Sequence, residues 1–387
     1  MRSLRVALLT PCYWPEVRRG TERFTHELAT GLLARGQEPM LITSHPRWPT
    51  RRVEEGLPVL RLPRPPQRPL SRAGFEDYLT HVPLSYAALR AGSYDIAHAM
   101  YQVDGLAAAR WRARTGRPAV LSYMGIPDAG WLRSARWREA VTRRAVAGCD
   151  AVVALSNHAA KHFRSSLGCD ARVIPPGVDL AAFTRLAARS DRPTIVCSAA
   201  SEVERKNVRL LLDALGLIRQ KRSDTRLILS QPRNRALASN VLGNLNIPGL
   251  EWRNLDHTVE LARAYSEAWV VALPSVNEAF GLVLVEALAC GTPVVGYAHS
   301  AVPEIVDRPQ LGRLFGTLEP EPLAQALLET FTLTDDPATD AACRARAAEF
   351  SVERCVERYL ALYRELLGAG SHGPPDRTQV IAGGSSA

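Results

Sequence analysis

The sequence predicts an α/β fold built from two doubly wound parallel sheets that follow one another along the chain. Short apolar segments alternate with amphipathic segments of helical period, which is typical of parallel strands joined by crossover helices. A run rich in proline and glycine, residues 174–179, interrupts this alternation near the middle. The length of 387 residues is sufficient for two domains that each bury a core. We therefore expect one domain at residues 1–180 and a second at 181–351.

The first half begins with a buried strand at residues 4–9, and a loop connects it to a helix at 21–35. In this helix Phe24, Leu28 and Leu32 recur at four-residue spacing, and Gly36 ends it. Further strands are predicted at residues 39–43, 59–62, 94–99, 119–123 and 150–155, with helices between them.

The second half repeats the alternation. Strands are predicted at residues 194–198, 226–230, 269–273 and 294–295, and helices at 208–220, at 258–267 and from Gly281 onward. A final helix at 352–367 carries Val356, Leu360, Tyr363 and Leu367 on one face. The last segment, 368–387, is rich in Gly, Ser and Pro and is predicted to be disordered.

Composition limits the class of protein and its partners. The N-terminal apolar run is too short for a signal peptide, and no run approaches the roughly 18 residues of a membrane span, so a cytoplasmic location is expected. Seven scattered cysteines without a C-x-x-C pair indicate free thiols and no metal site. The net charge of +9 favours an acidic partner, which is a nucleic acid, an anionic lipid or a phosphorylated ligand, and the sequence contains no nucleic-acid motif. Because most of the excess is arginine, genomic base composition is an alternative explanation of part of this charge.

The most specific motif is residues 277–296, NEAFGLVLVEALACGTPVVG. Glu278 precedes a Phe-Gly turn, and Glu286 follows within an apolar segment of helical character. A helix that begins near Gly281 directs its N–H groups and its positive dipole end toward the preceding loop, where a diphosphate can bind. The two carboxylates then lie on either side of the phosphates, about 10 Å apart along the helix. They suit the hydroxyl groups at the two ends of a nucleotide sugar.

This motif resembles the Glu, seven residues, Glu signature of the retaining glycosyltransferases of the family 4 type. The resemblance implies a GT-B fold, with two Rossmann-like domains facing each other across a cleft. It implies that the N-terminal domain binds the acceptor, that the helix at about 352–367 returns to it, and that the C-terminal domain binds the nucleotide sugar. The expected activity is transfer of a sugar to a hydroxyl of a small polar or lipid-linked acceptor, with no metal and no other cofactor.

The resemblance also assigns residues to the donor site. Glu278 and Lys206 are the expected catalytic residues, because the family has a lysine that contacts the diphosphate at the position of Lys206. The run Glu204-Arg205-Lys206 alone is also typical of a solvated surface, but a predicted strand and helix flank it. The full set of expected donor-binding residues is Gly20, Arg205, Lys206, Glu278, Ala279, Phe280, Gly281, Leu282, Val283 and Glu286.

The chain departs from the family pattern at three places. Met124 stands where the family commonly has a histidine near the sugar, and a thioether cannot hold a proton there. Arg19-Gly20 replaces the usual pair of glycines, and residues 198–201 lack the usual arginine. As residues near the acceptor or the sugar we expect Arg19, His98, Tyr123, Met124 and Asp128, although a lone histidine such as His98 is more often structural.

Three alternatives remain open from the sequence. The departures are compatible with a regulatory protein that binds nucleotide sugars with impaired turnover. A phosphorylase-like or epimerase use of the same cleft is a second alternative, although no cofactor-lysine motif is evident. The segment 131–148, with five arginines and two tryptophans, is either a surface helix that packs its tryptophans inward or a helix in peripheral contact with an anionic membrane, in which case the acceptor is lipid-linked.

Overall fold

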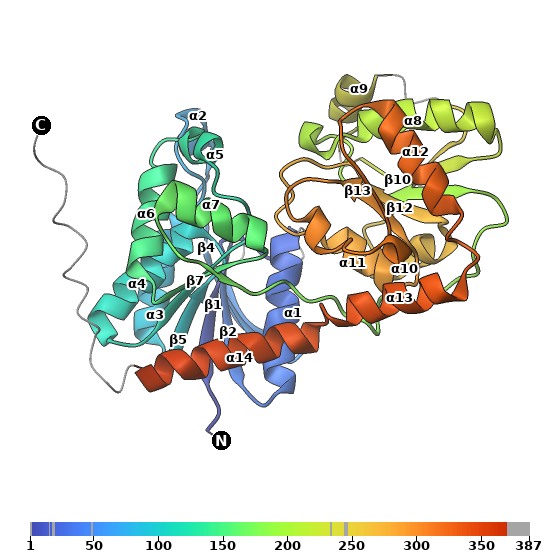
Figure 1. Cartoon of the computed structure of the whole chain (residues 1–387). Helices are drawn as coiled ribbons and strands as arrows, with labels where there is room; N and C mark the ends of the chain where they lie inside the picture. Colours follow the sequence, from blue (N-terminus) through green and yellow to red (C-terminus); the bar gives the residue numbers. More distant parts are fainter. Residues whose placement is uncertain are drawn as a thin grey trace, which may run out of the picture.

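Two α/β domains lie side by side in the computed structural model, and a long C-terminal helix runs along the first of them (Figure 1). The structure describes residues 2–14, 16–17, 20–47, 49–232, 234–243 and 247–369. Each domain contains one sheet, and the chain passes from one sheet to the other between residues 174 and 193. The predicted pair of doubly wound sheets is confirmed.

The N-terminal sheet has eight strands in the order β3-β4-β2-β1-β5-β6-β7-β8, and every neighbouring pair is parallel except β3 with β4. The strands are β1 (Arg5–Leu9), β2 (Glu38–His45), β3 (Thr50–Glu54), β4 (Leu57–Pro63), β5 (Ile96–Ala99), β6 (Ala119–Tyr123), β7 (Ala151–Ala154) and β8 (Arg172–Val173). The chain order reverses between β1 and β5, and this reversal leaves a crevice at the carboxyl ends of these strands.

Helices cover both faces of this sheet. They are α1 (Gly20–Ala34), α2 (Arg68–Arg72), α3 (His81–Ala91), α4 (Gln102–Thr115), α5 (Ala129–Arg133), α6 (Arg138–Gly148) and α7 (Asn157–Leu167). Because side chains alternate along a strand, Val6 and Leu8 of β1 enter the core beneath α1, while Ala7 and Leu9 enter the core on the opposite face. A strand buried on both faces explains the continuous apolar run at the start of the sequence.

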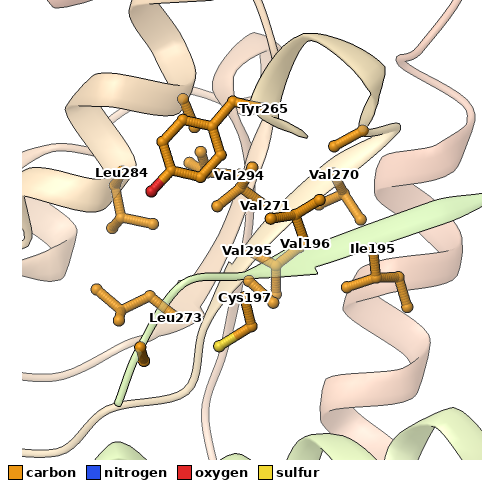
Figure 2. Close-up of a cluster of buried hydrophobic side chains, with 14 of the residues drawn as sticks. Ile195, Val196, Cys197, Tyr265, Val270, Val271, Leu273, Leu284, Val294 and Val295 are labelled. Atoms are coloured by element: carbon orange, nitrogen blue, oxygen red, sulfur yellow. The ribbon is translucent and has the colours of Figure 1, made fainter. Parts of the chain in front are cut away.

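The C-terminal sheet is parallel throughout, in the order β11-β10-β9-β12-β13-β14. Its strands are β9 (Thr194–Cys197), β10 (Arg226–Ser230), β11 (Leu250–Arg253), β12 (Val270–Leu273), β13 (Val294–Tyr297) and β14 (Gly312–Phe315). Its helices are α8 (Val208–Lys221), α9 (Arg235–Leu242), α10 (Thr258–Glu267), α11 (Leu282–Ala289), α12 (Pro320–Phe331) and α13 (Pro337–Ala348), with short 3₁₀ turns η1 (Glu204–Lys206), η2 (Val302–Glu304) and η3 (Pro309–Leu311). Figure 2 shows the centre of this core, where β-branched side chains of β9, β12 and β13 meet Tyr265 of α10 and Leu284 of α11.

Helix α14 (Val352–Ala369) belongs to the C-terminal end of the chain but packs on the N-terminal domain (Figure 1). Cys355, Val356, Tyr359 and Tyr363 are buried with residues of β1 and α1. The Tyr363 hydroxyl lies 2.6 Å from Nδ1 of His98, and the Tyr359 hydroxyl lies 2.7 Å from the Ser122 hydroxyl. Helix α14 therefore joins the C-terminal end of the chain to the N-terminal domain.

The structure differs from the sequence analysis in several elements. The sequence analysis missed β3, β8, β11, β14, α9, α12 and α13. A single helix over residues 131–148 is wrong: α5 ends at Arg133, and Trp137 adopts a left-handed conformation before α6 begins. Within the described ranges, no helix combines the length and the apolar character needed to cross a membrane. Of the expected tail, residues 368–369 belong to α14, and 370–387 lie outside the described residues.

The start of α14 predicts a steric requirement at Gly177. A Cβ atom there would collide with the Val352 backbone and lie 2.8 Å from its nitrogen. We expect Gly177→Ala to destabilise the protein by about 1–3 kcal/mol, because backbone cannot yield as a flexible side chain does. Gly216→Ala is the matched control: it lies on α8 with open space around it and should stabilise by about 0.5–1 kcal/mol. Thermal unfolding measures both, and an unchanged melting temperature for Gly177→Ala would contradict the packing.

Candidate active site

Two cavities meet between the domains. The larger, about 660 Å³, lies mainly against the C-terminal domain and is lined by the segments that follow β9, β10 and β12, with Gly20 and Thr21 of α1 opposite. The smaller, about 590 Å³, lies mainly in the N-terminal domain and is lined by residues that follow β5 and β6. Both cavities lie at the carboxyl ends of parallel strands, where open α/β sheets bind their ligands.

Five residues line both cavities and mark the point where the cavities join: Thr21, Met124, Arg205, Glu278 and Ala279. A molecule in one cavity can therefore present a reacting atom to a molecule in the other. Four of the five are among the residues that the sequence singled out, and Thr21 directly follows the predicted Gly20.

Lys206 and Glu278 form an ion pair at this junction. Lys206 ends the turn η1 after β9, Glu278 lies in the loop after β12, and Lys206 Nζ donates to Glu278 Oε2 over 2.7 Å. Each side chain is less than one fifth exposed, so the pair is shielded from bulk water. Arg205 is half exposed and lies 3.9 Å from the same oxygen. The site therefore holds two cations beside one carboxylate and can accept further negative charge.

The N-terminus of α11 faces the larger cavity. Gly281, Leu282 and Val283 line it, together with Ala279 and Phe280. Gly281 has φ = 104°, a conformation that favours glycine and that allows the chain to turn sharply from the loop into the helix. The first N–H groups of a helix lack partners within it and carry its positive dipole end. This wall and Lys206 carry the groups that the motif assigns to a diphosphate, and the binding of an anion there stays a prediction.

Glu286 is placed differently from the expectation. It is 1% exposed and is not among the residues that line either cavity. Arg23 of α1 reaches across from the N-terminal domain and lies 2.8 Å from Glu286 Oε1. The Tyr265 hydroxyl donates to Glu286 Oε2 over 3.4 Å and lies 2.7 Å from the hydroxyl of Ser198, which lines the larger cavity. Among the described residues, hydrogen bonds connect Glu286 to the larger cavity through Tyr265 and Ser198, and its contact with a ribose stays a prediction.

His98 is not a site residue, contrary to the expectation. It is fully buried beneath α14, with Nδ1 close to Tyr363 and Nε2 2.7 Å from the Ser122 hydroxyl. Burial lowers the pKa of His98 to about 3, so the ring stays neutral. A histidine at a strand end can face either the cleft or the core, and here it faces the core.

The other residues expected near the acceptor or the sugar have these placements. Tyr123 and Asp128 line the smaller cavity, and Met124 lies at the junction. Asp128 also caps α5, because its carboxylate accepts from the N–H of Trp131 over 2.9 Å. Arg19 lies outside the described residues.

The sequence analysis missed several residues of the site. Gln231 and Asp256 line the larger cavity, and Tyr78, Tyr101 and Trp131 line the smaller one. Some of these follow predicted strands directly, which is a signal that strand-end inspection could have used. Arg23 had no such signal, because nothing in the sequence pairs it with Glu286.

The comparison with protein families agrees with this geometry. The family described as Glycosyltransferase Family 4 matches residues 18–182, and Glycosyl transferases group 1 matches residues 192–332. A D-inositol 3-phosphate glycosyltransferase of Mycolicibacterium gilvum is 32% identical over 320 residues, which cover 75% of this chain and 70% of that protein. The chain belongs to glycosyltransferase family 4.

Solved structures confirm the GT-B fold of this family 4 glycosyltransferase. Sucrose-phosphate synthase from Thermosynechococcus elongatus matches with a TM-score of 0.78 at 21% identity, over 95% of this chain and 100% of that one. Anabaena HepE in complex with UDP-glucose matches with a TM-score of 0.69 at 17% identity, over 93% of this chain and 100% of that one.

Met124 contributes to packing in this glycosyltransferase. It is partly buried and packs against the apolar cores of both domains at the junction of the cavities. Met124 therefore provides an apolar contact between the domains at the junction and has no group that titrates.

The contact between Arg23 and two carboxylates predicts a pH dependence. Arg23 Nε donates to Glu27 Oε1 over 3.0 Å while its other end faces Glu286. Burial raises the pKa of Glu27 to about 7, against the opposing effect of Arg23. The folded state therefore binds this proton more tightly than the unfolded state, whose pKa is the ordinary 4.5, and stability decreases as pH rises from that value to 7.

Glu27→Gln removes this titration and keeps an oxygen that can accept from Arg23. We expect the stability of the variant relative to the parent to increase between pH 5 and pH 8 by on the order of 1–3 kcal/mol. Urea unfolding at several pH values measures this difference. Glu139→Gln on α6 controls for the loss of a surface carboxylate. A constant difference between variant and parent across this pH range would show that Glu27 keeps an ordinary pKa in the folded protein.

Proposed function

We propose that the protein transfers a sugar, with retention of anomeric configuration, from a nucleotide sugar in the larger cavity to a hydroxyl of an acceptor in the smaller cavity. The observation that carries this proposal is the junction of the two cavities at Glu278, beside Lys206 and the N-terminus of α11. A donor and an acceptor bound on either side of this point would meet at the sugar.

The walls of the larger cavity support a nucleotide-sugar donor. The start of α11 and Lys206 together offer N–H groups and a cation to a diphosphate. Ser230, Gln231 and Asp256 line the same cavity and supply polar groups for a nucleoside. The structural neighbour HepE was solved with UDP-glucose, which agrees with a donor of this class.

In the proposed reaction the acceptor oxygen bonds to the anomeric carbon on the face from which the phosphate oxygen departs. The leaving diphosphate takes the proton of the acceptor hydroxyl, so no protein base is needed, and Met124 at the junction is compatible with this course. Negative charge grows on the diphosphate as the sugar bond breaks. Lys206 and the α11 N-terminus stabilise that charge in a site that is already organised, and we propose that no metal ion or other cofactor is required.

Glu278 binds the sugar in this proposal. Its Oε2 is bound by Lys206, and its position at the junction allows the carboxylate to accept hydrogen bonds from the sugar hydroxyls. The carboxylate also offsets part of the positive charge of Lys206 and Arg205 until the diphosphate binds. Removal of Lys206 would therefore weaken donor binding twice, through a lost contact and through an uncompensated Glu278.

The acceptor is proposed to be a small polar molecule or a lipid head group. The curated relative from Mycolicibacterium gilvum is named for D-inositol 3-phosphate, which is a small polar acceptor. A cytoplasmic location and peripheral contact with its membrane through residues 131–148 stay predictions. In that segment Trp137 is 63% exposed, whereas Trp131 lines the smaller cavity.

We expect Lys206→Ala to weaken donor binding by about 1.5–3 kcal/mol, roughly 10- to 150-fold in Kd, because it removes a charged hydrogen bond to the diphosphate. Calorimetry measures this with whichever UDP-, GDP-, ADP- or TDP-sugar gives the largest thermal shift. Lys221→Ala, at the far end of α8, is the matched control. Equal affinities of the two variants would remove Lys206 from the donor site.

Hydrolysis of the donor distinguishes an enzyme from a regulatory protein. We expect the parent protein to release sugar slowly from the bound donor without an acceptor, and we expect Lys206→Ala to lose this release. Tight binding of the donor with no turnover across a panel of acceptors would favour the regulatory alternative.

A further inference from the structure

The smaller cavity contains features that select among acceptors. Its walls carry four large aromatic side chains, Tyr78, Tyr101, Tyr123 and Trp131. The ring of Tyr123 meets that of Trp131 edge to face, at 5.8 Å between centroids. The Tyr101 hydroxyl donates to the buried carboxylate of Glu22 over 2.9 Å, which fixes its ring. Rigid aromatic walls with polar tips suit a ring that has apolar faces and a hydroxylated edge.

The charged groups of this cavity are mostly acidic. Among the described residues that line it, Glu76, Asp77, Asp128 and Glu278 are acids, and Arg138 and Arg205 are bases. Glu76 is buried and in direct contact with the Arg138 guanidinium, and Glu278 is bound by Lys206. These pairs compensate each other. Among the described residues neither Asp77 nor Asp128 forms an ion pair, and the remaining base of the lining is the half-exposed Arg205.

This balance disfavours a phosphate group. The Arg138 guanidinium already donates through Nε to the buried Glu76 carboxylate and through Nη1 to Ser134, so a phosphate dianion would have to share a cation whose charge is compensated. The Arg138 side chain is further fixed over the Trp131 ring, 4.3 Å from its centroid. The only other guanidinium in the described lining, Arg205, is beside the donor cavity and 3.9 Å from Glu278, where the diphosphate would compete for it.

A second, independent feature points to a ligand in this cavity. Tyr123 is 4% exposed, and its buried hydroxyl has no hydrogen-bond partner among the residues that the structure describes. An unpaired buried hydroxyl is costly, and a hydroxyl or amine of a bound molecule would relieve that cost. Tyr123 lies next to Met124, so a molecule bonded to its hydroxyl would be close to the junction with the donor cavity.

We propose that the acceptor is a sugar or other ring polyol that carries no phosphate, and that an acceptor with an ammonium group is preferred over a neutral one. This inference rests on the proposed function, and it separates this protein from a transferase that acts on a phosphorylated polyol. The aromatic walls receive the ring, Asp77 and Asp128 attract the ammonium group, and Tyr123 bonds a polar group near the reacting hydroxyl.

Three matched hexoses test the proposal, because they differ mainly in charge: glucosamine, glucose and glucose 6-phosphate, with D-inositol 3-phosphate as a fourth acceptor. The measured quantity is the acceptor-dependent release of nucleoside diphosphate, as kcat/KM, with the donor saturating. We expect glucosamine to equal or exceed glucose, and both to exceed each phosphorylated acceptor at least tenfold. A phosphorylated acceptor that equals or exceeds its neutral counterpart would overturn the inference.

A double variant identifies the residues responsible. Asp77→Asn/Asp128→Asn should lower the ratio of glucosamine to glucose at least threefold, because it removes both carboxylates while asparagine can still cap α5. Asp213→Asn/Asp224→Asn makes the same charge change on exposed residues at α8 and just after it, and it should leave the ratio unchanged. An unchanged ratio in the first variant would contradict the role of these acids.

Arg19→Ala is measured with the same four acceptors. If the parent protein prefers the phosphorylated acceptors and Arg19→Ala loses this preference, the inference is overturned.

Donor binding separates this inference from the proposed function. If no acceptor accelerates release while the donor still binds in a manner that depends on Lys206, the acceptor inference fails and the donor site stands. If the donor does not bind, both fail.

Discussion

The arrangement of the domains depends on a carboxylate that the sequence places inside an apolar helix. Glu286 points into the interior, where an unpaired charge is too costly to keep, and the cation that pairs with it, Arg23, belongs to the other domain. Arg23 also lies over the Phe183 ring, at the start of the C-terminal half. A second contact crosses nearby, because Glu304 accepts from the N–H groups of Asn157 and His158 at the start of α7. The charge of Glu286 is therefore compensated by a contact that also joins the two domains.

This constraint links the structure of the cleft to the donor site. The helix that carries Glu286 begins at the wall where Lys206 and Glu278 meet, so a change in the contact with Arg23 would reach the α11 N-terminus through one rigid element. The path through Tyr265 to Ser198 reaches the same cavity from a second side. Glu27, with its raised pKa, shares the guanidinium of Arg23 and makes this contact sensitive to pH near neutrality. A bound nucleotide would thus act on groups that also hold the domains together.

The sequence was sufficient for the fold, and it singled out many of the residues that line the two cavities. The two rounds of strand and helix, and the motif around Glu278 with Lys206, follow from local patterns, because each residue lies at the end of its own strand or at the start of its own helix. Contacts between distant segments could not be read in this way. The pairing of Arg23 with Glu286 depends on how the domains meet, and His98 faces the core only because α14 brings Tyr363 to it. The interruption of the helix at Trp137 could not be predicted from composition, because tryptophan and arginine also occur in continuous amphipathic helices.

The most direct test of the account is a crystal structure of the protein with an intact nucleotide sugar, or with its non-transferable 2-fluoro analogue. We expect the diphosphate to lie within hydrogen-bond distance of Lys206 Nζ and of the first N–H groups of α11, with the sugar beside Glu278 and the anomeric carbon open to the smaller cavity. A nucleotide bound outside the larger cavity, or a sugar turned away from Glu278, would contradict the account.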